Sequence, residues 1–131
     1  MEHINPDGLV KNPNFSQIVT TQGDGRTIYI GGQNAVNAQR EIIGQGDIAL
    51  QTEQVMHNLQ AALRACGANY NNLVKLTIYI LQGQNLYSAF QTSQRFLNGL
   101  ADPPVISVLI VAGLANPDFL IEIDAIAFIS T

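Results

Sequence analysis

Apolar side chains recur with helical spacing in two parts of the chain, and this spacing predicts two helices. The first covers about Ile48 to Cys66: Asp47 can cap its start, and Gly67 is a natural residue to end it. The second begins after Asn85, which can also serve as a cap, and ends at Asn98-Gly99.

Runs of β-branched and aromatic residues predict five strands. They cover Ser16–Thr20, Thr27–Ile30, Val74–Leu81, Ile106–Ala112 and Leu120–Ile129. The turn residues Gly23-Asp24-Gly25 predict that the first two strands pair as a hairpin, and residues 33–46 are expected to form a loop. The resulting order, β-β-α-β-α-β-β, is typical of an α+β fold in which one sheet carries two helices on one face.

The strand Ile106–Val111 is apolar throughout except for Ser107. A strand without polar alternation is expected to be buried on both faces. Two helices can cover only one face of the sheet, so something outside the domain must cover the other. A closed homo-oligomer is the usual solution, and we expect one here.

Composition supports this expectation. The length of 131 residues fits a single domain over residues 1–131. Of these residues, 47% are apolar and only 12% are charged. Typical domains carry about 25% charged residues, so part of this surface is expected to be covered by other subunits. The net charge is −4 and the six basic residues are dispersed, which argues against nucleic acid as a partner.

Cysteine content and hydropathy restrict the remaining possibilities. The single cysteine, Cys66, excludes an internal disulfide and a cysteine-based zinc cluster, and no motif indicates a bound metal or cofactor. No apolar run approaches the roughly 18 residues of a membrane span, and Met1–Pro6 does not resemble a secretory signal. We therefore expect a cytoplasmic protein that does not bind membranes.

Several motifs carry a resemblance to a known family. They are Asn5-Pro6-Asp7-Gly8, Asn14-Phe15-Ser16-Gln17, Ile30-Gly31-Gly32-Gln33, Gln51-Thr52, Asn116-Pro117-Asp118 and Leu120–Ala127. In one register over nearly the whole chain, the sequence resembles the reactive-intermediate deaminase (RidA/YjgF) family. The resemblance implies a chorismate-mutase-like α+β fold and a homotrimer with small-molecule sites in the three clefts between subunits.

The resemblance also implies a chemistry, which is hydrolysis of 2-imino or enamino acids to 2-keto acids and ammonia. In that chemistry an arginine binds the substrate carboxylate with two charge-assisted hydrogen bonds. Backbone groups near a Ser-Gly-Gln segment orient the substrate. A glutamate late in the last strand helps to activate or position the water.

This sequence departs from the family pattern at most of its polar site positions. Ile106 falls at the arginine position, Val108 at a cysteine, Phe15 at an aromatic hydroxyl, Gly31 at the serine and Phe90 at an asparagine, whereas Gly32 and Glu122 remain as the resemblance implies. Burying an unpaired carboxylate costs several kcal/mol. Hydrolysis of 2-imino acids through the usual clamp is therefore not expected, and an apolar cleft with one acid at its edge fits a neutral ligand.

Two site features have alternative interpretations. Glu122 is either a general acid or base, or an exposed strand acid beside Asp124, which shares its face. Gly31-Gly32 either presents backbone N–H groups to a ligand or marks a bulge or close backbone approach. His57 is interpreted as a surface residue and Cys66 as a packing residue.

Three functions remain open. The first is a ligand-binding or regulatory trimer that lacks the family reaction. The second is an enzyme, a divergent deaminase acting on a less polar imine, enamine or enol through Glu122 and backbone amides. The third is a structural or interaction module. Some members of the resembling family have been described as ribonucleases or translation inhibitors, but the acidic balance of this chain argues against that activity here.

Overall fold

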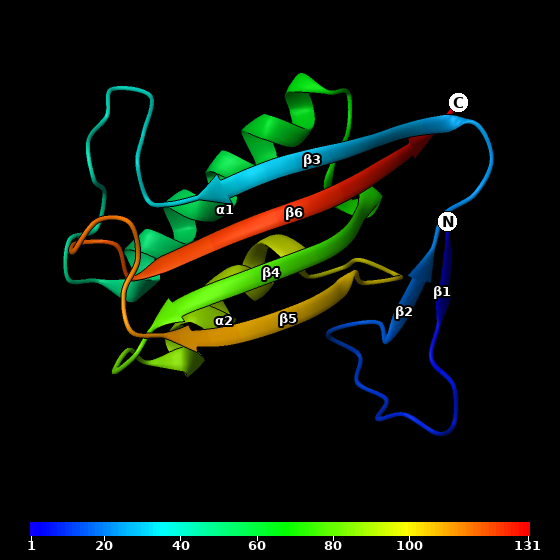
Figure 1. Ribbon diagram of the computed structural model, residues 1–131, viewed down its shortest axis with the longest axis horizontal. Coiled ribbons are helices and arrows are strands. Elements are labelled where there is room, and N and C mark those ends of the chain that lie inside the picture. The colour runs from blue at the N-terminus through cyan, green and yellow to red at the C-terminus, as the bar shows by residue number, and fades with distance from the viewer.

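A computed structural model describes residues 1–131 and shows one sheet with both helices on the same side of it (Figure 1). In chain order the elements are β1 (Glu2–Ile4), β2 (Ile18–Thr20), β3 (Gly25–Gln33), α1 (Ile48–Ala65), the short 3-10 turn η1 (Tyr70–Asn72), β4 (Leu73–Leu81), α2 (Leu86–Leu97), β5 (Val105–Val111) and β6 (Ile121–Ser130).

The main sheet has four strands in the order β3-β6-β4-β5. The pair β4 and β5 is parallel and is connected through α2, whereas β6 pairs antiparallel with both β3 and β4. The sheet is therefore mixed. The predicted α+β fold, with two helices packed on one face of a mixed sheet, is confirmed.

The predicted hairpin between the first two strands is wrong. β2 pairs with β1, placing His3 opposite Val19, and these two strands form a separate small sheet that stands beside the main one (Figure 1). Asn5 helps to close this pair, because its side-chain oxygen accepts a hydrogen bond from the backbone N–H of Gln17 at 2.8 Å. β3 instead pairs with β6, which offers a longer antiparallel partner than β2.

The predicted helix ends are confirmed. The Asp47 carboxylate accepts a hydrogen bond from the backbone N–H of Leu50 at 3.1 Å, and the Asn85 side chain accepts one from Ser88 at 3.1 Å. Gly67 follows α1 with a φ of +73°, a left-handed conformation that favours glycine. Neither helix combines the length and apolar character needed to span a bilayer.

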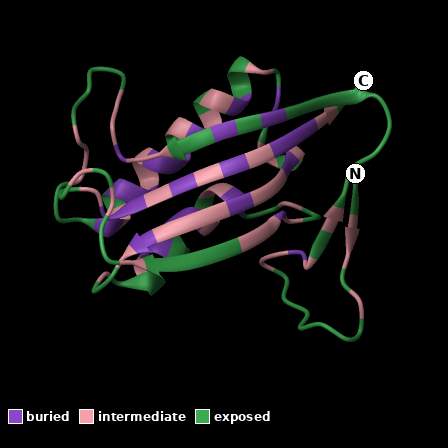
Figure 2. Cartoon of the chain, viewed as in Figure 1, coloured by how far each residue is buried: buried purple, intermediate pink, exposed green.

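The hydrophobic core lies between α1 and the middle of the sheet. Val55, Met56, Leu59 and Leu63 on α1 are fully buried, and the purple segments of Figure 2 follow the central strands. Gln51 is also fully buried. Its amide donates to the Asp118 carbonyl at 2.8 Å and accepts from the Leu120 N–H at 2.9 Å, which ties the turn before β6 to α1.

In the single chain the strand Ile106–Val111 is not buried on both faces, and the expectation that another subunit covers it stays a prediction. Val108, Leu109 and Ile110 are 55%, 43% and 52% exposed, and the second half of β5 is green in Figure 2. The physical reason is position: β5 is the last strand of the sheet and only β4 pairs with it. An edge strand that is apolar and uncharged is a surface on which another chain can pair or pack.

Candidate functional site

A pocket of about 310 Å³ lies between α2, the strands β4, β5 and β6, and the chain just before β2. It brings together four of the predicted site residues, Phe15, Phe90, Ile106 and Val108. The other residues that line it are Asn14, Ile78, Ile80, Leu86, Ala89, Ser93, Gln94, Leu97, Ile121 and Ile123. None of the lining side chains is charged, and this volume is at the lower end of the range for small-molecule pockets.

The register of the sheet forms the apolar floor of this pocket. Ile78 is opposite Val108 on one side and Ile123 on the other, so three branched side chains form a row across the sheet. Ile106 lies two residues before Val108 and therefore projects from the same face. This face of the strand borders the pocket within one chain, and its place in a cleft between subunits stays a prediction.

Small side chains on the inner face of α2 explain why a cavity remains. Ala89 and Ser93 are buried, one turn apart, and both line the pocket. Neither reaches far enough to fill the space above the isoleucines of β4 and β6. Phe90, the next residue on α2, is 44% exposed and lines the pocket at its outer side.

The wall opposite α2 comes from the N-terminal arm, residues 1–24. The backbone N–H of Ser16 donates to the Pro104 carbonyl at 3.0 Å, and its hydroxyl donates to the Pro103 carbonyl. Ser16 is only 2% exposed. These contacts attach the arm to the start of β5 and hold Phe15 against the pocket.

Glu122 and Gly32 lie on the other side of the sheet. Ile121 and Ile123 line the pocket, so the intervening Glu122 projects from the opposite face. A side chain at Gly32 would collide with the Glu122 carboxylate, which would then have to move. The expectation that one acid lies at the edge of the apolar pocket is therefore not met within a single chain.

Gly31 and Gly32 mark an irregularity in β3. The pairing register between β3 and β6 shifts between Ile30 and Gln33, and the side-chain amide of Gln33 donates to the Gly31 carbonyl at 3.1 Å. This register shift agrees with the bulge interpretation, and the interpretation that Gly31-Gly32 presents backbone N–H groups to a ligand stays a prediction.

The sequence did not indicate Asn34 as a site residue, yet it holds Glu122 in place. Its amide donates to Glu122 Oε1 at 3.2 Å and to the Ile121 carbonyl at 3.3 Å. Asn58 on α1 secures the same segment, since its amide donates to the Asn34 carbonyl at 3.0 Å. In the sequence, the only indication of this role was an asparagine directly after Gly31-Gly32-Gln33.

The face around Glu122 is acidic. Asp124 projects from the same side of β6, and the Tyr79 hydroxyl donates to Asp124 Oδ2 at 3.4 Å. The charge of Asp124 raises the pKa of the Tyr79 hydroxyl, and partial loss of water, the hydrogen bond and the charge of Glu122 act in the same direction. This face carries two carboxylates that can pair with cations, whereas no charged side chain lines the pocket.

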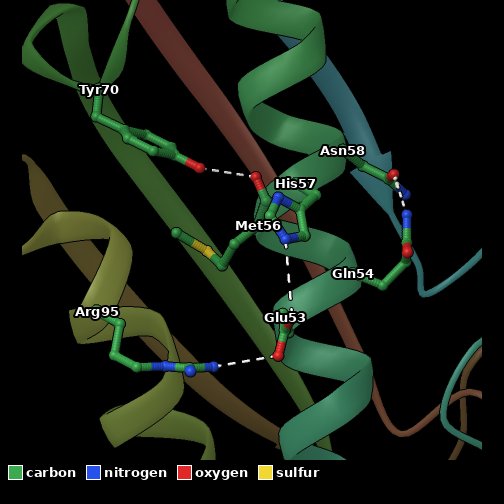
Figure 3. A network of polar contacts seen from close by, with 7 residues as sticks. All are labelled: Glu53, Gln54, Met56, His57, Asn58, Tyr70 and Arg95. Carbon is green, nitrogen blue, oxygen red and sulfur yellow. Dashed lines mark hydrogen bonds and ion pairs between the residues drawn. The ribbon is translucent and has the colours of Figure 1, made fainter.

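A polar network on the outer side of the helices lies apart from both faces (Figure 3). Glu53 pairs with Arg95 of α2 at 3.2 Å and with His57 at 3.8 Å. The His57 ring also packs edge-on against Phe96, with ring centroids 5.0 Å apart. His57 is thus a surface residue that links the two helices, in agreement with its interpretation from the sequence.

Two further residues stabilise the end of α1. Cys66 packs against the core, as its interpretation as a packing residue predicted. Its carbonyl accepts a hydrogen bond from the Arg26 guanidinium at 2.8 Å. A cation at the C-terminal end of a helix interacts favourably with the helix dipole, so Arg26 attaches β3 to α1.

Comparisons with known proteins agree with this architecture. The family model described as endoribonuclease L-PSP matches residues 9–129. A RutC family protein of Pyrococcus horikoshii is 33% identical over 104 residues, which cover 79% of this chain and 80% of that protein. A 2-iminobutanoate/2-iminopropanoate deaminase of Mus musculus is 28% identical over 113 residues, 86% of this chain and 79% of the enzyme.

A solved structure extends the similarity over the whole fold. A protein of unknown function of the conserved Rid family from Yersinia pestis superposes with a TM-score of 0.85 at 36% identity, covering 98% of both chains. The family match, the relatives and the shared fold confirm the resemblance seen in the sequence motifs. The chain belongs to the RidA/YjgF family, whose members include the RutC proteins and which the endoribonuclease L-PSP model describes.

Proposed function

We propose that this protein is a homotrimer that binds a small, neutral and largely apolar metabolite, and that it does not hydrolyse 2-imino acids through an arginine clamp. The observation that carries the proposal is the pocket itself. It contains Ile106 at the position of the family arginine, and no charged side chain lines it.

The energetics favour a neutral ligand. A carboxylate that entered the pocket would lose its hydration and find no cation to pair with, at a cost of several kcal/mol. An uncharged apolar group would instead leave water for contact with the isoleucines of β4 and β6, at about 25 cal/mol for each Å² removed from water.

The distribution of the site residues supports an assembly with sites between subunits. Within one chain, Phe15, Phe90, Ile106 and Val108 line the pocket while Gly32 and Glu122 face the other side of the sheet. The two groups lie on opposite faces of the sheet, and the apolar edge strand β5 has no partner on its outer side. A neighbouring copy packed along this edge would cover β5 and could bring its own Gly32 and Glu122 to the mouth of the pocket.

One observation favours a second candidate, a deaminase for a less polar imine or enamine with Glu122 as acid or base. Asn34 engages only Oε1 of Glu122, which leaves Oε2 available to a water or a ligand. A carboxylate held in one orientation is the arrangement that proton transfer requires.

A coupled assay for ammonia release from 2-aminoacrylate, combined with calorimetric titration of neutral and charged carbonyl compounds, tests the proposal. We expect no acceleration of hydrolysis, binding of neutral carbonyls and no binding of 2-ketobutyrate. Hydrolysis at rates typical of family deaminases would refute the proposal. Hydrolysis of an uncharged enamine that disappears in Glu122→Gln would instead support the second candidate.

A further inference from the structure

Two side-chain amides lie where the apolar pocket meets a more polar hollow. The hollow measures about 190 Å³ and shares Asn14, Gln94 and Leu97 with the pocket. Its remaining lining consists of Pro13, Asn98, Gly99, Leu100, Pro103 and Pro104. The two spaces adjoin, one apolar and one more polar, and Asn14 and Gln94 line both.

Neither amide is used within the chain. Both residues form hydrogen bonds only through their backbone. The backbone N–H of Asn14 donates to Asn12 Oδ1 at 2.8 Å, and the backbone carbonyl of Gln94 accepts from the N–H of Asn98 at 2.7 Å. The third polar residue of the pocket, Ser93, already donates its hydroxyl to the Phe90 carbonyl at 2.9 Å. The half-buried Asn14 and Gln94 thus keep their side-chain donors and acceptors free.

The two amides are carried by well-anchored segments. Gln94 lies in the third turn of α2, and Asn14 lies two residues before Ser16, which is bonded to Pro103 and Pro104. Each amide offers an N–H donor and a carbonyl acceptor. A polar group that loses water without gaining a partner lowers affinity, so a ligand that covers these amides must itself present both kinds of partner.

Building on the proposed function, we propose that the ligand is an amphiphile with an apolar body and an uncharged carboxamide or lactam head. The body occupies the chamber lined by Ile78, Ile106 and Ile123, and the head pairs with Asn14 and Gln94. A carboxylate head has no cation in the lining, and an ammonium head has no acid. A ketone head offers only an acceptor, so the side-chain carbonyl oxygens of Asn14 and Gln94 would find no donor on the ligand.

Three probes that share a pentyl carbonyl skeleton test this assignment by calorimetric titration. Hexanamide has a donor and an acceptor, 2-heptanone has only an acceptor, and hexanoate is charged. We expect hexanamide to bind about five- to tenfold more tightly than 2-heptanone, the difference expected from one neutral hydrogen bond, and hexanoate not to bind.

Matched variants locate the preference. Gln94→Met and Asn14→Leu should each reduce the ratio of hexanamide to 2-heptanone affinity severalfold while leaving the binding of 2-heptanone nearly unchanged. Gln91→Met is the control. Gln91 lies on the same helix, but its amide donates to the Tyr87 hydroxyl and it does not line the pocket, so the ratio should not change.

The outcomes separate the two proposals. Equal binding of hexanamide and 2-heptanone, with hexanoate excluded, would overturn the amide head and leave the neutral pocket intact. A preference for hexanamide that survives both Gln94→Met and Asn14→Leu would overturn the assignment to these residues. If hexanoate bound as tightly as hexanamide, or if neither neutral probe bound, the proposed function itself would fail.

Discussion

The two helices cover the same face of the sheet but close it to different degrees. Under α1, the side chains of Val55, Met56 and Leu59 are fully buried, and they pack on β3 and β6. Under α2, the buried positions include Ala89 and Ser93, and a cavity of about 310 Å³ remains above β4 and β5. The sheet therefore has a closed half, formed by α1, β3 and β6, and an open half, formed by α2, β4 and β5.

The difference shows that the size of inward-facing side chains, more than the amphipathic pattern, decides whether a helix forms core or pocket. Both helices are amphipathic and both have an asparagine or aspartate cap. A large apolar residue at each inward position fills the space beneath a helix at close-packed density, whereas alanine and serine leave it empty. The open half also contains the edge strand β5, so ligand binding and subunit packing are both expected there.

The largest effect should come from a charge on the exposed edge strand. Leu109 is 43% exposed in the single chain, so Leu109→Asp should leave the fold intact but place an unpaired carboxylate in the subunit interface. We expect complete loss of the trimer, measured by light scattering coupled to size-exclusion chromatography, with an unchanged circular dichroism spectrum.

The matched control is Ala61→Asp, which places the same charge at an exposed position of α1 in the closed half. It should remain trimeric. A wild-type protein that is a stable monomer of 14.2 kDa at micromolar concentration would refute the trimer directly.

Enlarging a buried alanine should distinguish the two halves by stability. Ala127 on β6 is fully buried in the core, so Ala127→Leu should lower the free energy of unfolding by about 1 to 3 kcal/mol. Ala89 lines the cavity, so Ala89→Leu should change it by less than about 1 kcal/mol and should block ligand binding. Urea unfolding at one protein concentration measures both. Equal destabilisation would show that the space under α2 is not available.

Restoring the family cation should give the open half a weak affinity for carboxylates. Ile106 lines the pocket, so the guanidinium of Ile106→Arg can point toward a ligand and form a bidentate pair with a 2-keto acid. We expect millimolar binding of 2-ketobutyrate, of order −4 kcal/mol, and tighter binding when Phe90→Asn is added, because Phe90 occupies the adjacent space. Titration calorimetry measures both.

The cost of this change is stability, because the new arginine has no partner in the unliganded state. If neither variant binds a keto acid while both remain folded trimers, Ile106 and Phe90 do not belong to a functional cleft.

The smallest effect concerns Tyr70 in the closed half. Its hydroxyl donates to the Met56 carbonyl at 2.7 Å, and burial raises its pKa to about 12 despite the opposing charge of Arg64. Because burial favours the neutral phenol, Tyr70 adds to the free energy of unfolding at any pH at which its hydroxyl is protonated. This contribution is complete below about pH 10 and is lost between about pH 10 and 12. For a half-buried group we expect a loss on the order of 1 kcal/mol.

An absorbance titration of the phenolates checks this prediction. Tyr70→Phe should remove a component that titrates near pH 12 in the folded protein. If the wild-type curve lacks such a component, or if it persists in Tyr70→Phe, the burial of this hydroxyl has been misassigned.

Much of the fold could be predicted because it depends on local patterns. Asp47 and Asn85 have side chains that cap helices, Gly67 tolerates a left-handed backbone, and the β-branched runs form β4, β5 and β6 nearly as expected. The motif register also placed Phe15, Phe90, Ile106 and Val108 together, and all four line one pocket, although their role in a functional site stays a prediction.

Other features depended on partners distant in the chain. β2 pairs with β1, and β3 pairs with β6 about a hundred residues later in the chain, and the local turn residues Gly23-Asp24-Gly25 report neither pairing. Likewise, Asn34 acquires its role only because the irregularity in β3 brings it to the carboxylate of Glu122, 88 residues later.

The sequence by itself determined most of the elements, the helix caps and the α+β class, because these depend on residue type and short-range spacing. The assignment of Ile106 to the family arginine position rests on the resemblance and stays a prediction. Only the tertiary structure decided that β5 is an exposed edge, that Glu122 faces away from the pocket, and that α2 leaves a cavity. Each of these depends on which side chains meet across the sheet and how completely they fill the space between its layers.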